Sequence, residues 1–135
     1  MRLLAIDLGH KRTGLAVGDE DTRIVTPLRV VEAGDDEQRL AAIAGVIESH
    51  DPGALVLGLP LNMDGSEGPA AKQARVFADL LRERFELEVH LHDERLSSSA
   101  ADQQMAGSGL SHGQKKARRD ALSAATILRD YLAAL

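Results

Sequence analysis

Acidic residues stand at three places among apolar residues, where a solvated carboxylate would be out of place. Asp7 interrupts an apolar run near its end, the pair Asp93 and Glu94 closes a later alternating segment, and Asp120 opens an otherwise apolar helical stripe. A buried carboxylate is costly unless it is paired or bound to a cation. Carboxylate oxygens from distant segments are the ligands that Mg²⁺ and Mn²⁺ prefer. These acids are therefore candidates for a divalent-metal site.

Such a site would suit the hydrolysis of a phosphodiester. Two divalent ions about 4 Å apart can activate a water molecule and stabilise the leaving oxygen. Other interpretations stay open for single residues. Asp120 also fits an ordinary first-turn acid favoured by the helix dipole, or a partner of Lys116 one turn earlier. Strand alternation does not decide which of Asp93 and Glu94 turns inward.

Basic residues adjoin the last of these acids. Four of the five residues from Lys115 to Arg119 are basic, although the chain as a whole has a formal charge of −5. Net negative charge argues against a nucleic-acid partner, since phosphate binding is largely electrostatic. A nuclease needs both acids for cations and a nearby basic patch for phosphate. The alternative is a solvated helix start.

The elements that must position the acids follow the order β-β-β-α-β-α-β-α. Apolar and β-branched runs predict strands over 3–8, 15–17, 24–31, 54–59 and 87–91, with helices after 35, after 69 and up to 135. Pro27 indicates an edge strand or a bulge. We expect one α/β domain over 1–135, a mixed five-stranded sheet with helices on both faces. The carboxyl edge of its strands would then gather Asp7 and the Asp93–Glu94 pair.

Composition narrows the class of protein. Apolar residues make up 44% of the chain and aromatic residues only 2%, so platforms for base stacking are scarce. The absence of cysteine excludes disulfides and thiolate metal sites. Asp7 interrupts any signal-peptide apolar region, and no stretch has membrane-spanning length. A cytoplasmic protein without membrane association is the expectation.

Four segments together resemble the YqgF family, also named RuvX. The matching stretches, in family order along nearly the whole chain, are Asp7–Asp19, Gly58–Ser66, Asp93–Ser98 and the final helix from Asp120 through Ala124-Ala125 to Ile127-Leu128. The resemblance implies a ribonuclease-H-like fold related to the Holliday junction resolvase RuvC. It implies a nuclease site, with Mg²⁺ or Mn²⁺, at Asp7, Glu94 and Asp120, with Asp93 as a further possible ligand. It also implies processing of the 5′ end of the 16S ribosomal RNA precursor.

Two departures accompany the resemblance. RuvC-like resolvases carry a further acid in the last helix, where this chain has Ser123. Serines replace the family's threonines at Ser97 and Ser98, which keeps the hydroxyl groups.

A set of polar residues is predicted to bind substrate, mostly through phosphate. Its members are Lys11, Arg12, Asn62, Arg95, Ser97, Ser98, Lys115, Lys116 and Arg119. For several of them a structural role is the alternative. Lys11 and Arg12 fit exposed residues of the first hairpin turn, Asn62 is a common turn former, and Arg95 can bridge to a neighbouring acid.

Three rival functions remain. A DNA endonuclease cutting four-way junctions normally needs a two-fold symmetric homodimer, for which the sequence shows no face. Sugar-kinase and actin-like ATPases begin with a similar Asp-x-Gly hairpin but need two such domains. A non-catalytic RNA-binding assembly factor is disfavoured by the low aromatic content and the negative charge.

Overall fold

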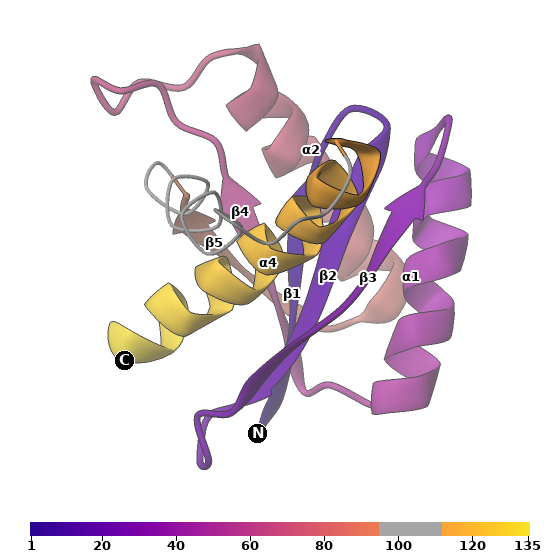
Figure 1. Ribbon diagram of the computed structural model, residues 1–135, viewed down its shortest axis with the longest axis vertical. Coiled ribbons are helices and arrows are strands. Elements are labelled where there is room, and N and C mark those ends of the chain that lie inside the picture. Colours follow the sequence, from indigo (N-terminus) through magenta and orange to yellow (C-terminus); the bar gives the residue numbers. More distant parts are fainter. Residues whose placement is uncertain (95–111) are drawn as a thin grey trace.

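The computed structural model describes residues 1–94 and 112–135, and side chains within 1–94 and 122–135. These residues form a single sheet with helices packed against it (Figure 1). In chain order the elements are β1 (Arg2–Leu8), β2 (Arg12–Asp19), β3 (Val25–Glu32), α1 (Asp36–His50), β4 (Ala54–Leu59), α2 (Pro69–Phe85), β5 (Glu88–Asp93) and α4 (His112–Ala133).

The sheet is mixed, with the strand order β3-β2-β1-β4-β5. The first three strands pair antiparallel as a meander, and β4 and β5 add parallel to β1 through the crossovers α1 and α2. This confirms the predicted five-stranded sheet. The sequence predicted an edge strand or a bulge at Pro27, and both are found. Strand β3 lies at the edge of the sheet, and its register with β2 shifts between Leu15 and Ala16.

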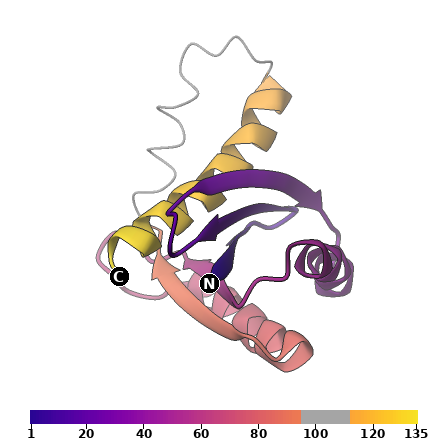
Figure 2. The ribbon, with the colours of Figure 1, turned by 90° about the horizontal axis from the view of Figure 1, so that it is seen from below.

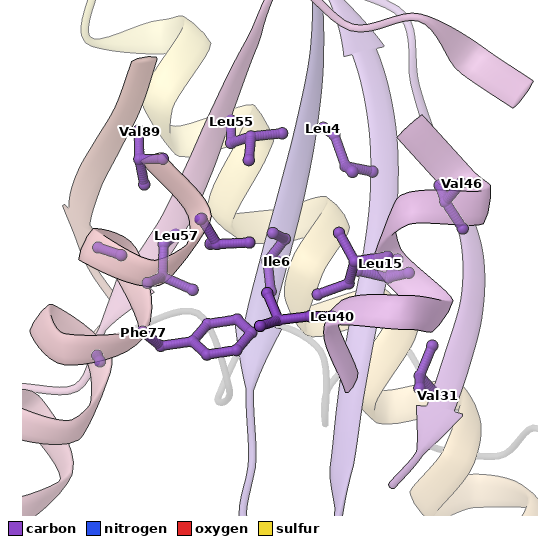
Figure 3. Close-up of a cluster of buried hydrophobic side chains, with 14 of the residues drawn as sticks. Leu4, Ile6, Leu15, Val31, Leu40, Val46, Leu55, Leu57, Phe77 and Val89 are labelled. Carbon is purple, nitrogen blue, oxygen red and sulfur yellow. The ribbon is translucent and has the colours of Figure 1, made fainter. Parts of the chain in front are cut away.

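Helices cover both faces of the sheet, as predicted. Alternation along β1 sends Leu4 and Ile6 into one apolar cluster, under α1 and α2, and sends Leu3 and Ala5 into a second cluster under α4. Figure 2 shows α4 and α2 on opposite sides of the strands. Figure 3 shows the first cluster, in which Phe77 of α2 lies among aliphatic side chains of the central strands.

Helix α4 crosses the sheet obliquely, from the end where β1 finishes toward the end where β1 begins (Figure 1). Near its end, the carbonyl of Leu132 accepts a 2.6 Å hydrogen bond from the Arg23 guanidinium in the β2–β3 turn, at the end of the sheet where β1 begins. The first turns of α4 therefore lie at the opposite end, where β1 finishes (Figure 1). This direction brings the backbone of Asp120 toward the strand end that holds Asp7.

The first hairpin differs from the sequence-based prediction. The second strand begins at Arg12 rather than Leu15, so Arg12 lies outside the turn. The reason is cross-strand pairing: Arg12 stands opposite Glu32 of β3, and their side chains form an ion pair at 3.5 Å. Lys11 stays in the turn and is exposed.

Helix α1 fixes this hairpin through a buried arginine. Arg39 donates from Nε to Thr13 Oγ1 at 2.9 Å and from Nη2 to the His10 carbonyl at 3.1 Å. Its guanidinium also lies 5.8 Å from the ring centre of Phe77. A buried charge needs such partners, and here they tie the β1–β2 turn to the helix layer.

Helix boundaries follow local chemistry. The Asp35 side chain accepts from the Gln38 backbone N–H at 2.8 Å and so caps α1. Asp51 and Glu86 end α1 and α2 in the left-handed conformation. Among the described residues, no helix combines the length and apolar character needed to cross a bilayer.

Candidate functional site

Asp7 is the penultimate residue of β1 and faces α4. It follows Leu3 and Ala5 on that side of the strand, and it stands opposite Gly14 of β2. It is half-buried, at the carboxyl edge of a central strand. Open α/β sheets usually place their sites at this edge.

Glu94 follows the last residue of β5 and continues its pairing with β4. Its backbone N–H donates to the Leu59 carbonyl at 3.3 Å. Alternation places it on the same face as His90 and His92, whose rings lie 5.6 and 6.1 Å from that of Tyr131 on α4. Both histidines are half-exposed.

The structure distinguishes the two neighbouring acids between which strand alternation alone could not decide. Asp93 is exposed, whereas Glu94 is half-buried and its side chain hydrogen-bonds to Asp7. The two carboxyl groups thus meet although β4 separates their strands. Two of the three predicted acids are therefore brought together.

The electrostatics of Glu94 reflect this contact. Burial is the largest cause that raises its pKa, from an ordinary 4.5 to about 8; the charge of Asp7, the hydrogen bond with Asp7 and the charge of Asp93 add to it. Two carboxyl groups in contact cannot both ionise without strong repulsion. The pair therefore holds a proton near neutral pH.

Gly58 of β4 lies beneath the Glu94 carboxylate, and sequence reasoning attached no individual role to it. A Cβ on Gly58 would overlap Glu94 Oε2. The available signal was a glycine inside an otherwise continuously apolar buried strand, which often marks a close approach of another group.

The third predicted acid, Asp120, belongs to α4, one helical turn before the buried Ala124. Its side chain lies outside the described ones. Among the side chains that are described, no group of three or more His, Asp or Glu residues is placed to hold a metal. The structure thus documents the pair and leaves the role of Asp120 a prediction.

One basic residue at the first hairpin has an unused donor. Arg12 Nη1 is buried and has no hydrogen-bond partner among the described residues, while Arg12 Nε pairs with Glu32. Alternation along β2 places Arg12 on the α4 side, because the next residue, Thr13, bonds Arg39 of α1 on the other side.

Six of the residues predicted to bind substrate have side chains outside the described ones. Arg95, Ser97 and Ser98 fall outside the described residues. Lys115, Lys116 and Arg119 are in the first turns of α4, and their side chains are not described.

Comparison with known proteins identifies the family of this chain. The model of the family described as "RuvX: Holliday junction resolvase" matches residues 1–134. The chain belongs to the RuvX family. A relative from Anaeromyxobacter sp. (strain Fw109-5), named "Putative pre-16S rRNA nuclease", is 44% identical over 132 residues, which cover 98% of this chain and 96% of the relative.

Solved structures agree on the fold. RuvC of Thermus thermophilus in complex with a Holliday junction substrate has a TM-score of 0.61 at 17% identity, over 99% of this chain and 95% of that one. The Holliday junction resolvase of fowlpox virus has a TM-score of 0.61 at 12% identity, over the full length of both chains. The ribonuclease-H-like fold expected from the sequence is confirmed.

In this RuvX-family chain the loop after β4 is held by its own polar groups. The Asn62 backbone N–H donates to the Ser66 carbonyl at 2.9 Å, and Asn62 Nδ2 donates to Ser66 Oγ at 3.0 Å. Asp64 accepts from the Ser66 backbone N–H at 2.9 Å. Asn62 is thus a turn former here, and its exposed position leaves substrate binding as a prediction.

Proposed function

We propose that this chain is a divalent-metal-dependent nuclease that hydrolyses phosphodiester bonds at the 5′ end of precursor 16S ribosomal RNA in the cytoplasm. The observation that supports this best is the meeting of Asp7 and Glu94 at the carboxyl edge of the sheet. The name of the 44% identical relative supports the substrate. The whole chain would act as one domain.

The site's donors fit Mg²⁺ or Mn²⁺. Asp7 and Glu94 present oxygen atoms from two strands, and their mutual repulsion is the kind that a divalent cation relieves. Asp120 of α4, and less directly Asp93, would complete the ligand set. When bound, such a cation supplies an activated water and stabilises the leaving oxygen.

The protein's own groups would do the remaining work. Asp7 pairs with Gly14 of β2 and directly follows Ile6, which pairs on both sides of β1, so the backbone that carries its carboxylate is well supported. Glu94 would hold the cation as a carboxylate and would release its proton on binding, since a cation favours the charged form. Arg12 would offer its unused Nη1 to a phosphate oxygen, with Lys11 and the basic start of α4 extending the contact along the backbone. Arg95, Ser97 and Ser98 would add to that contact.

Cleavage of a 5′-extended ribosomal RNA fragment in Mn²⁺ tests the proposal. The wild-type protein should shorten the extension, and Asp7→Asn should bind the fragment without cutting it. Chelation of the metal should abolish cutting in the wild type. Equal cutting by wild type and Asp7→Asn would overturn the proposal, and binding without cutting by both would indicate a non-catalytic RNA-binding assembly factor.

A second candidate is a DNA endonuclease for four-way junctions. The family description and the fold shared with junction resolvases favour it. Such an enzyme normally presents two sites in a two-fold dimer. Offering the same protein a four-way DNA junction and the RNA fragment in parallel, with sedimentation of the free protein, separates the two activities.

A further inference from the structure

Gly58 occupies the position where Glu94 must cross β4 to reach Asp7. The strands carrying these acids, β1 and β5, flank β4, and neighbouring strands are about 4.8 Å apart. In register, Gly58 pairs with His92 of β5, and the preceding Leu57 pairs with Ile6 of β1. Gly58 therefore stands level with Asp7, between the two acids.

The space above Gly58 is filled by two side-chain ends. A Cβ there would overlap Glu94 Oε2, and it would lie 3.1 Å from Glu94 Cδ and 2.8 Å from Ile127 Cδ1 of α4. The Glu94 carboxyl group thus rests on the Gly58 main chain, beneath α4. Any larger residue would occupy the same volume.

The backbone at this position does not itself require glycine. Among the described glycines, only Gly65 has a positive φ, so Gly58 has a conformation open to any L residue. Glycine in a strand interior also weakens the strand relative to residues with side chains. What glycine provides at position 58 is therefore the space that a side chain would otherwise fill.

We propose that Gly58 is a positioning residue for the metal site: by leaving the α4 face of β4 bare, it lets Glu94 reach across the strand and share a cation with Asp7. This inference rests on the proposed function, because it assumes that the pair binds a divalent ion. In this role Gly58 would act through Glu94 and not by holding the cation itself.

Gly58→Ala tests the inference, with Mn²⁺ alone as the probe. Both atoms that would meet the new methyl group are ends of flexible side chains, so β4 should persist while Glu94 swings away from Asp7. We expect Mn²⁺ affinity to fall by about 10- to 100-fold, the range seen when groups that orient metal ligands are lost. With RNA, kcat should fall by a similar factor and KM should change little.

Two further variants separate positioning from packing. Gly45→Ala in α1 introduces a methyl group into open space and should leave Mn²⁺ affinity unchanged. Gly58→Ala/Ile127→Val removes the Ile127 Cδ1 atom, so the overlap with α4 is relieved while that with Glu94 remains. The double variant should still bind Mn²⁺ weakly.

The outcomes are distinguishable. Wild-type affinity for Mn²⁺ in Gly58→Ala, or its recovery in the double variant, would overturn the role of Gly58 and leave the proposed function standing. Unfolding of both Gly58 variants without metal would show that β4 itself requires glycine, and would overturn the inference too. If wild type bound Mn²⁺ no better than Asp7→Asn, the proposed function would fail and the inference with it.

Discussion

Glu94 and Asp7 hydrogen-bond to each other although a whole strand, β4, lies between theirs. The contact is made over the bare backbone of Gly58, on the face that α4 covers. A carboxyl pair in this setting stores repulsion whenever both groups are ionised. Its behaviour with pH, metal and substitution follows from that.

The stability of the metal-free protein should fall as pH rises from about 4.5 to about 8. The folded state holds the Glu94 proton to about pH 8, whereas the unfolded chain releases it near 4.5, so the unfolded state binds fewer protons in this window. The slope should reach at most ~1.4 kcal/mol per pH unit. Urea unfolding between pH 4 and 9 measures it, and Glu94→Gln should flatten the curve. An unchanged slope in Glu94→Gln would refute the assignment.

Asp7→Asn should abolish nuclease activity without unfolding the protein. The amide keeps the shape of the side chain and removes the negative charge that a cation needs, so the loss should exceed the ~100-fold of an outer-shell change. The same substitution should bring the pKa of Glu94 down, because a like charge disappears. Activity assays with Mn²⁺ and the pH dependence of unfolding check both effects. Asn at position 7 with full activity would exclude a ligand role.

Thr13→Val should destabilise the fold by about 1–3 kcal/mol. It removes the acceptor of the buried Arg39 Nε and leaves that donor unsatisfied. Arg84→Ala, which breaks an exposed ion pair with Glu37, is the matched control and should cost less than about 1 kcal/mol. Urea denaturation compares them. Equal losses would mean that the Arg39 network contributes no more than a surface pair.

Gly18→Ala should destabilise the protein, by about 1–3 kcal/mol, because α4 packs directly on this glycine. The added Cβ would lie 2.8 Å from Leu128 Cδ2 and 3.1 Å from the Ile24 carbonyl. Gly45→Ala, in the exposed interior of α1, should instead stabilise by roughly 0.5–1 kcal/mol. Thermal unfolding of the two variants should therefore shift in opposite directions. A shift of the same sign would contradict the close approach of α4.

Arg12→Gln should weaken RNA binding and lower its salt dependence. Loss of one phosphate contact reduces the slope of log affinity against log salt by about 0.7–0.9. Filter binding at several salt concentrations measures the slope, with Arg84→Gln as a control far from the hairpin in sequence. An unchanged slope would assign Arg12 to its ion pair with Glu32 alone.

Local sequence patterns determined the elements. Period-two and period-3.6 apolar spacing located the strands and helices, and Pro27 marked an edge strand or a bulge. The residue pattern also singled out Asp7 and the Asp93–Glu94 pair, because acids inside apolar runs are conspicuous without any structure. The sequence pattern started the second strand too late, because the inclusion of Arg12 depends on its pairing with Glu32 of β3.

The family resemblance already favoured Glu94 over Asp93, but the contact between Glu94 and Asp7, the raised pKa of Glu94 and its close approach to Gly58 emerged only in three dimensions. Each depends on which strands are neighbours and on how closely α4 covers them. Spacing along a chain encodes the face on which a residue lies, since that follows from backbone geometry alone. It does not encode distances between residues on different strands, because those are set by the packing of the whole sheet.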